Sequence, residues 1–276
     1  MITFFKILSV LPLSLLHGLG AVLGWLVFGV SGVYRRRFLA NAHQAGMGWR
    51  QWRGAVAQSG KLVAELPRLW LGAAPRCEWD NEACVKQAYA ARRGIVFLTP
   101  HLGCFEIAPQ RVAERFGAQY GPLTILYRPA RQAWLAKVMA LARERPGIRM
   151  VPTNLSGVRQ MIRALRAGQA VGLLPDQVPP EGMGQWAPFF GQPAYTMTLA
   201  ARLVQQTGAA VILVWGERLS WGRGFRLHFR EMTTVLSPEL DAAVVQINQA
   251  MEQLIRECPQ QYLWGYARYK QPRSEA

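Results

Sequence analysis

Short runs of apolar residues alternate along the chain with longer stretches in which apolar residues recur every three or four positions. The short runs, such as IVFLTP at 95–100 and AVGLLP at 170–175, show no alternation of polar and apolar positions. Continuous apolar runs of this kind are typical of parallel strands that are covered on both faces. The sequence predicts strands over 95–100, 123–127, 147–152, 170–175, 210–217 and 225–230.

Helical spacing accounts for most of the chain between these strands. The predicted helices cover 50–71, 81–92, 107–116, 133–145, 158–166, 197–206 and 239–257. Strands that alternate with helices imply an α/β fold with a mostly parallel central sheet flanked by helices. A short turn around Trp221 and Gly222 separates the last two strands, which predicts an antiparallel edge. Residues 175–193 are rich in Pro and Gly and are predicted as a long ordered loop, which in a compact domain is usually functional.

The N-terminus carries an apolar stretch of a different length. Residues 7–33 contain no charged residue and are followed by Tyr34 and the basic cluster 35–37. About 20 helical residues cross a hydrocarbon core, so the stretch is long enough to span a membrane. We therefore predict a membrane anchor over 1–34 and one domain over 35–276, which the basic cluster places in the cytoplasm.

An apolar stretch of this kind has two other interpretations. A signal peptide is disfavoured because the apolar run is longer than usual, lacks a small-residue cleavage site and has its basic cluster on the wrong side. A helix that lies in the membrane interface, or on the domain's own apolar surface, stays open. Gly20 and Gly24 are four residues apart and could support close helix packing, and His17 is predicted to be a helix-contact residue.

Composition and charge favour a membrane partner. Hydrophobic residues make up 51% and charged residues 17%, and 32 Lys and Arg face 16 Asp and Glu, a formal net charge of +16. Such a basic chain suits nucleic acid, an anionic membrane surface or an acidic carrier protein. The basic residues are scattered among Trp and Leu without a nucleic-acid-binding motif, and the apolar excess favours the membrane.

Cysteine usage points away from a metal or disulfide framework. The four cysteines form no CxxC pair and no Cys/His spacing that suits zinc; they are Cys77, Cys84, Cys104 and Cys258. We expect free thiols in a reducing compartment.

The strongest candidate for chemistry is His101, which directly follows the predicted strand 95–100. Ligands of open α/β sheets bind beyond the C-terminal ends of the strands. If the chain turns at Gly103, Glu106 can reach the imidazole, fix its tautomer and leave the other nitrogen free to accept a proton. That pairing deprotonates a hydroxyl which attacks a thioester. The spacing alone is not specific, because a surface pair or a core hydrogen bond has the same appearance.

Two further candidates lie nearby in the predicted fold. Cys104 could act as a thiolate activated by His101, but a small apolar filler at a helix start is the favoured interpretation. Asp176 and Gln177 follow the predicted strand 170–175 and could bind substrate hydroxyls or orient a basic side chain. The alternative for Asp176 is a loop carboxylate that caps backbone amides.

Five motifs, in order along nearly the whole chain, resemble those of the lipid A late acyltransferases within the lysophospholipid acyltransferase superfamily. The family's His-x4-Asp/Glu signature corresponds to His101 through Glu106. The other four are a Tyr-Arg motif, a Pro-Asp-Gln motif, a Phe-Gly element with a following Thr, and a C-terminal aromatic–basic signature; they lie at 127–129, 175–177, 189–196 and 261–270. Each motif is weak alone, and their order makes the resemblance specific.

The resemblance implies a reaction and its partners. The donor would be a fatty acyl thioester of acyl carrier protein, and the acceptor a hydroxyl on a lipid A precursor, a phosphorylated glucosamine disaccharide. His101 would be the general base and Glu106 its orienting partner, without a covalent acyl-enzyme. Arg128 would stabilise the oxyanion or hold a phosphate, and Asp176 and Gln177 would contact substrate or support the site. No metal or other cofactor is expected, and the location would be the bacterial inner membrane.

The chain departs from the family pattern at two places. Cys104-Phe105 stands where members often carry Asn-Trp, and Tyr266-Ala267 where they carry His-Arg. These differences weaken claims about an amide at 104 and about charged substrate contacts near the C-terminus. A lysophospholipid or aminolipid O-acyltransferase would use the same His/Glu pair and remains an alternative. A non-catalytic lipid-binding membrane protein would be expected to lose the His or the acid, and both are present.

Overall fold

The computed structural model describes residues 2–127 and 145–273. The helices are α1 (Ile2–Val10), α2 (Leu13–Val30), α3 (Gly32–Gln44), α4 (Trp49–Leu71), α5 (Glu82–Ala90), α6 (Ile107–Tyr120), α8 (Leu155–Arg166), α9 (Leu199–Thr207) and α10 (Leu240–Glu257). The strands are β1 (Cys77–Asp80), β2 (Ile95–Leu98), β3 (Leu123–Tyr127), β4 (Ile148–Pro152), β5 (Ala170–Leu173), β6 (Gly184–Phe189), β7 (Gln192–Met197), β8 (Ala210–Arg218) and β9 (Phe225–Glu231). Short 3-10 turns occupy η1 (Ser220–Gly222) and η2 (Pro259–Gln261).

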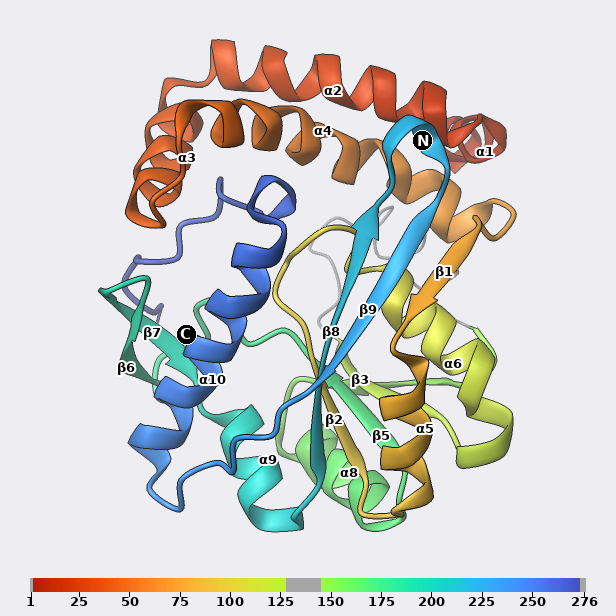
Figure 1. Cartoon of the computed structure of the whole chain (residues 1–276), viewed down its shortest axis with the longest axis vertical. Helices are drawn as coiled ribbons and strands as arrows, with labels where there is room; N and C mark the ends of the chain where they lie inside the picture. Colours follow the sequence, from red (N-terminus) through yellow and green to blue (C-terminus); the bar gives the residue numbers. More distant parts are fainter. Residues whose placement is uncertain (1, 128–144, 274–276) are drawn as a thin grey trace.

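A seven-stranded sheet in the order β1-β9-β8-β2-β5-β3-β4 forms the centre of the molecule (Figure 1). Its neighbouring strands are parallel except for β8 and β9, which are antiparallel. The predicted α/β fold with a mostly parallel sheet is therefore confirmed. β2 lies between β8 and β5, so the residues that follow it emerge near the middle of the sheet.

Alternate residues of β2 explain why both faces of the sheet are covered. Ile95 and Phe97 pack into an apolar cluster with α5 and α6, whereas Val96 and Leu98 pack into a second cluster with α8, α9 and α10. All four side chains are buried, in agreement with the continuous apolar run in the sequence. The result is a three-layer α/β/α sandwich.

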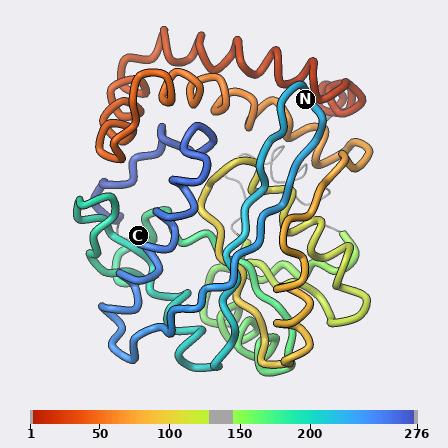
Figure 2. The backbone as a smooth tube through the Cα atoms, in the orientation of Figure 1, coloured from red at the N-terminus to blue at the C-terminus, as the bar shows by residue number. Residues whose placement is uncertain are grey.

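The N-terminal apolar stretch does not form one helix. Pro12 lies between α1 and α2, where its missing N–H interrupts helical hydrogen bonding, and Ser31 caps the start of α3 by accepting a hydrogen bond from the N–H of Tyr34. α2 runs alongside α4 and covers one end of the molecule (Figure 1). The segment that follows α10 approaches this layer through η2, as the dark blue and orange segments in Figure 2 show.

Two parts of the sheet structure differ from the prediction. β1 extends the sheet beyond β9, so the antiparallel strand is one place inside the edge. The predicted loop 175–193 contains β6, which forms an antiparallel hairpin with β7. Pro188 and Pro193 are paired in this hairpin. Because Pro is found mainly in edge strands that need few backbone donors, these residues argued against strands at the sequence level. The predicted helix 133–145 lies almost entirely outside the described residues.

Candidate active site

His101 lies just beyond the C-terminal end of β2, at the sheet position where α/β proteins bind ligands. The segment after it is held by backbone pairing: Gly103 forms a β-bridge with Gly216 of β8, and Leu102 one with Tyr262. Gly103 has φ +59°, and a Cβ there would meet the carbonyl oxygen of Gly216. The two glycines thus permit the close approach that fixes the His101 loop to the sheet.

Asp176 holds His101 through two contacts. Its Oδ1 lies 2.7 Å from the ring Nδ1, and its Oδ2 accepts a hydrogen bond from the backbone N–H of His101 at 2.9 Å. Burial acts to raise the pKa of Asp176, which is 2% exposed, but the charge and hydrogen bonds of His101 outweigh it and lower that pKa. The carboxylate therefore stays ionised and favours the tautomer with hydrogen on Nδ1.

Gln177 lies on the opposite side of the ring. Its side-chain Nε2 is 3.0 Å from Nε2 of His101. With hydrogen on Nδ1, the ring Nε2 carries a lone pair, and the amide nitrogen of Gln177 donates to it. In this tautomer a single amide group covers the lone pair of Nε2.

Glu106 is placed differently from the predicted pairing. Both ring nitrogens of His101 are taken by residues 176 and 177, and Glu106 Oε2 accepts a hydrogen bond from the indole N–H of Trp70 at 3.3 Å. The orienting position on Nδ1 belongs to Asp176, one of the roles that the sequence left open for that residue. A catalytic role for Glu106 stays a prediction.

A cavity of about 470 Å³ opens beside His101. Glu106 and Gln177 also line it, and most of the remaining wall is apolar; the apolar members are Phe105, Pro109, Ile125, Leu126, Ile148, Met150, Leu173, Leu174, Val178, Pro179 and Met197. A smaller apolar cavity of about 50 Å³ shares Phe105, Ile125 and Gly172 with it. An apolar cleft with a few polar groups at one point is the usual form of a small-molecule site.

The Tyr-Arg motif reaches the same end of the sheet. Tyr127 is the last residue of β3, which pairs with β5. Arg128, predicted to stabilise the oxyanion or hold a phosphate, lies outside the described residues.

Residues of the C-terminal signature form hydrogen bonds with the backbone of the site. The N–H of Leu263 donates to the carbonyl oxygen of His101 at 3.1 Å, and the hydroxyl of Tyr266 accepts from the N–H of Val178 at 3.0 Å. Tyr266, which stands at one of the two departures from the family pattern, therefore supports the chain next to Gln177. Arg268 is 3% exposed and donates to the carbonyl oxygen of Tyr195 and to Oγ1 of Thr196. Motifs far apart in the sequence thus meet around one histidine.

Cys104 does not have the environment of a nucleophile. Its side chain is fully buried, with apolar neighbours on one side and the Glu65–Arg218 pair close to the thiol. Burial raises the pKa of the Cys104 thiol well above its usual value, which disfavours the thiolate needed for attack. The structure supports the apolar-filler interpretation.

A buried ion pair lies behind the His101 loop, and the sequence did not predict it. Arg218, at the end of β8, donates to both oxygens of Glu65 on α4 at 2.6 and 2.7 Å, and to the carbonyl oxygen of Gly103 at 3.3 Å. His17 of α2 lies 2.9 Å from the same Glu65 carboxylate. Glu65 is 48 residues from His17 and 153 residues from Arg218 in the sequence, so only the fold brings the three together.

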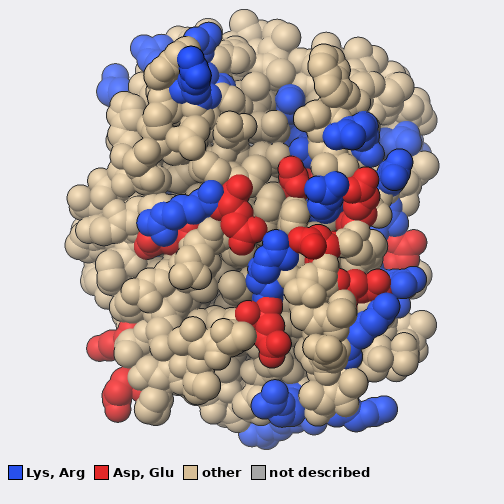
Figure 3. All heavy atoms as spheres, in the orientation of Figure 1, with Lys and Arg blue, Asp and Glu red and all other residues tan. Residues whose placement is uncertain are grey.

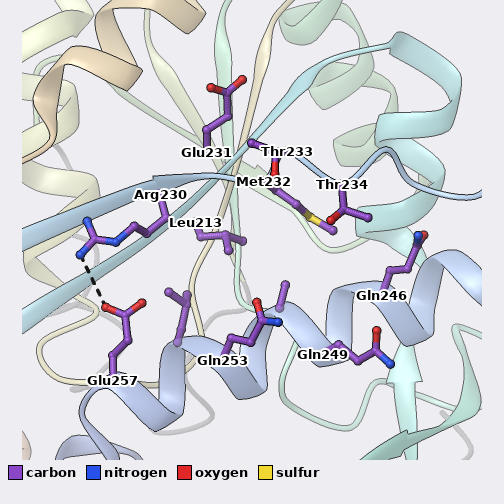
Figure 4. A pocket seen from close by; sticks show the side chains of 12 residues that line it. Leu213, Arg230, Glu231, Met232, Thr233, Thr234, Gln246, Gln249, Gln253 and Glu257 are labelled. Atoms are coloured by element: carbon purple, nitrogen blue, oxygen red, sulfur yellow. Dashed lines mark ion pairs between the residues drawn. The ribbon is translucent and has the colours of Figure 1, made fainter.

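Another cavity, of about 310 Å³, lies between β9 and α10 (Figure 4). It is lined mainly by polar side chains, including Thr233, Gln246 and Gln253, and by the Arg230–Glu257 ion pair at 3.6 Å. Its lining residues include neither histidine nor cysteine. Its two carboxylates, Glu231 and Glu257, therefore have no imidazole beside them in the cavity, and the histidine chemistry stays with the His101 cavity.

The fold and the site define a class: an α/β protein in which a carboxylate-held histidine faces an apolar cavity at the end of the sheet, suited to proton removal beside an acyl chain. Residues 55–271 match the family of bacterial lipid A biosynthesis acyltransferases, and the chain belongs to this family.

Named relatives agree with this membership at low identity. The chain is 26% identical over 187 residues to the lipid A biosynthesis palmitoleoyltransferase of Escherichia coli (strain K12), and 26% identical over 190 residues to the lauroyltransferase of that strain. A lipid A biosynthesis acyltransferase of Shigella flexneri is also 26% identical over 187 residues. In each case the match covers 67% of this chain and 59% of the relative.

Proposed function

We propose that this protein is a membrane-bound acyltransferase that moves a fatty acyl chain from an acyl carrier protein thioester to a hydroxyl of a lipid A precursor. The observation that carries the proposal is the environment of His101: Nδ1 is fixed by the buried carboxylate of Asp176, and Nε2 lies at the wall of an apolar cavity. Family membership supplies the reaction class, and the geometry supports His101 as the general base.

The proposed reaction follows from the two ring nitrogens. The acceptor hydroxyl displaces the amide of Gln177 and donates to Nε2 of His101. As the hydroxyl oxygen attacks the thioester carbonyl, its proton passes to Nε2, and Asp176 stabilises the resulting imidazolium. A C–O bond forms, the C–S bond breaks, and the proton leaves with the departing thiol.

Two carboxylates are candidates for the orienting role. The family signature suggests Glu106, and the geometry favours Asp176, which contacts both the ring and the backbone of His101. Glu106 lines the cavity next to the ring, where it is placed to contact substrate. We retain it as a proposed site residue, together with Arg128 from the Tyr-Arg motif.

A basic face on α8 supports an acidic carrier protein as the donor. Arg159, Arg163 and Arg166 lie at helical spacing, all are exposed, and α8 contains no acidic residue. None of the three has an ion-pair partner within 2–127 and 145–273. α8 begins two residues after Thr153, which lines the His101 cavity. From there α8 runs back toward the start of β5, so this basic face begins near the cavity and offers an anionic protein a surface along the flank of the domain.

Product analysis with defined donors and acceptors tests the proposed reaction. Membranes that contain the protein are incubated with acyl carrier protein thioesters and a tetraacyl lipid A precursor, and products are followed by mass spectrometry. We expect one acyl chain to be added to the precursor. Transfer only to a lysophospholipid or aminolipid would replace the proposed acceptor, and no transfer to any hydroxyl would contradict an acyltransferase.

The same assay separates direct transfer from a covalent intermediate. Cys104→Ala should retain transfer, because the buried thiol takes no part in the proposed reaction. Loss of transfer in this variant, together with an acyl-enzyme trapped in the unmodified protein, would replace the general-base mechanism by a thiolate mechanism.

A further inference from the structure

α2 is apolar on every side, yet protein covers only one of its faces. The residues that face α4 and the sheet are buried, among them Leu16, Gly20 and Phe28. The opposite face is exposed and carries large apolar side chains: Leu15, Leu19, Val22, Leu23, Leu26 and Val30. A helix that is hydrophobic all round belongs in an apolar environment, so the exposed face requires a second apolar partner.

On the covered face, the backbones of α2 and α4 approach each other closely. A Cβ on Gly24 would lie 2.3 Å from the carbonyl oxygen of Val56, and one on Gly20 would lie 2.7 Å from the Cα of Lys61. Gly60 of α4 is equally tight against Gly20. Small residues at these positions let the two helix backbones touch, as the spacing of Gly20 and Gly24 suggested.

His17 fixes the first half of α2 to the domain electrostatically. Its Nε2 lies 2.9 Å from the Glu65 carboxylate, which is fully buried and also bound by Arg218. Pulling α2 away from α4 would remove one hydrogen-bonding partner from a buried charged group, which is costly. α2 is therefore a fixed part of the domain surface.

This packing conflicts with a helix that crosses the bilayer, although α2 is long and apolar enough to do so. α4 runs beside α2 and carries Arg50, Arg53, Lys61, Glu65 and Arg68. If α2 crossed the hydrocarbon core in this arrangement, α4 would enter it too, and charged side chains at that depth are expensive. With α2 flat on the surface, α4 lies one helix diameter further out, at the level of the polar headgroups.

Neighbouring elements extend the apolar face of α2. On α1, Phe4, Ile7 and Val10 are exposed, and Val10 is 71% exposed. The tip of the β8–β9 hairpin reaches the start of α2, and its Trp221 is 90% exposed. Figure 1 shows α1, α2 and this tip along the same end of the molecule.

Basic residues lie beside this apolar surface, at the end of α2 that adjoins α3. Arg35, Arg36 and Arg37 are exposed, and the guanidinium of Arg53 lies 5.9 Å from the ring centre of Trp25 and 5.4 Å from that of Trp49. On the face in Figure 3, Lys and Arg gather at this corner, and no Asp or Glu is seen along the edge formed by α2. Aromatic and cationic side chains together are typical of a contact with anionic lipid headgroups.

We propose that α1 and α2 lie in the plane of an anionic membrane surface, with their exposed apolar face in one leaflet and both ends of α2 on the same side of the bilayer. This inference rests on the membrane attachment in the proposed function and specifies its geometry. The sheet ends that carry His101 then face the helix layer nearest the lipid. An acceptor held in the membrane would reach the site without leaving the surface.

Labelling from one side of the bilayer tests this geometry. Thr3→Cys and Arg36→Cys place a thiol before and after α2, in a chain whose half-buried Cys77 and Cys258 are replaced by alanine. Sealed membrane vesicles that contain the full chain are treated with a membrane-impermeant maleimide. We expect both thiols to react from the same side. Reaction of only one before the vesicles are opened would show a crossing helix and overturn the inference, while membrane attachment would stand.

Binding to vesicles tests the proposed contact surface. Leu19→Glu and Leu26→Glu place a charge on the exposed face of α2, and Val235→Glu, at a side chain that is 87% exposed elsewhere, is the matched control. With vesicles of phosphatidylglycerol and phosphatidylethanolamine, we expect both α2 variants to lose most binding and the control to keep it. Unchanged binding by the α2 variants would contradict the inference. So would a detergent-free dimer that these variants dissociate, because a second copy would then cover the face.

Discussion

At the residue scale, the site depends on how two side chains divide the two nitrogens of one imidazole. Asp176 contacts Nδ1 at 2.7 Å, and Gln177 contacts Nε2 at 3.0 Å. These residues are adjacent in the loop that follows β5, and His101 lies just beyond the end of the neighbouring strand β2. Because β5 is the neighbour of β2, consecutive residues of one loop reach opposite sides of the ring.

Asp176→Asn should lower the rate of transfer by roughly 10²–10⁴-fold, the usual contribution of a positioned acid–base group. The amide keeps the shape of the carboxylate but no longer fixes the tautomer or stabilises the imidazolium. The rate is measured with saturating donor, and the thermal unfolding midpoint is recorded beside it. Glu106→Gln is the matched variant, and a larger loss there than in Asp176→Asn would return the orienting role to Glu106.

Gln177→Glu should shift the activity profile to higher pH. A carboxylate beside Nε2 would hold the imidazole in its protonated, cationic form over a wider pH range, and that form cannot accept the hydroxyl proton. Activity near pH 7 therefore falls and recovers as the pH is raised. Gln177→Ala is the control and should keep the original profile. If both variants gave the same profile, Nε2 would not be the basic nitrogen.

At the scale of elements, the N-terminal helices offer an apolar surface, whereas α8 offers a basic surface. α2 and α4 are joined by close backbone packing and by the contact of His17 with the buried Glu65 carboxylate. α8 presents its arginines to solvent without acidic neighbours on the helix. Each element offers a surface suited to one of the proposed partners, lipid or carrier protein.

Arg163→Glu should raise the KM for an acyl carrier protein thioester and leave the rate with a short-chain thioester lacking the carrier protein nearly unchanged. The charge reversal weakens the approach of an acidic protein and leaves the His101 cavity intact, and the effect should shrink as salt is added. Arg115→Glu on α6 is the matched control, because Arg115 is exposed but paired with Glu82. An equal rise in both variants would argue against a specific surface on α8.

Glu65→Gln should destabilise the fold by about 3–5 kcal/mol, because it removes the charge that compensates the buried Arg218. Burial acts to raise the pKa of Glu65, but Arg218 and His17 outweigh it and lower that pKa. The ion pair's stabilisation is therefore present above the ordinary glutamate pKa and is lost as the pH falls through the lowered value. Chemical unfolding across acidic pH should show this dependence in the natural chain and lack it in the variant.

The exposed pair of Glu78 and Arg226 provides the control for this measurement. Both side chains are partly solvent-exposed, at 35% and 44%. Glu78→Gln should change the unfolding free energy much less than Glu65→Gln, because water screens the pair. Similar losses in the two variants would mean that burial of the Glu65 pair has no special effect.

At the scale of the whole molecule, the sequence predicted the fold better than the contacts of the site. Strands such as β2 and β5 were evident because their apolar runs are continuous, and His101 was evident because it follows one of them. β1 was missed, since its half-buried residues CEWD show no strand pattern, and β6 was hidden by prolines.

The contacts of the site depend on long-range order that no local pattern contains. The pairing of His101 with Asp176 joins residues 75 apart, and it follows only once β5 is known to lie beside β2. His17 was predicted to be a simple helix-contact residue, because Glu65 and Arg218 are distant in the sequence. The structure places all three in one buried cluster behind the His101 loop.

The central claim is that His101 removes the proton of the acceptor hydroxyl, and the rate of transfer by His101→Ala tests it most directly. Product formation from an acyl carrier protein thioester and a lipid A precursor is followed for the natural chain and the variant at equal amounts of membrane-bound protein. We predict that the rate of transfer falls by roughly 10²–10⁴-fold. The thermal unfolding midpoint and the fraction of the protein that is bound to membranes should stay unchanged. Transfer by His101→Ala at the rate of the natural chain would contradict the account.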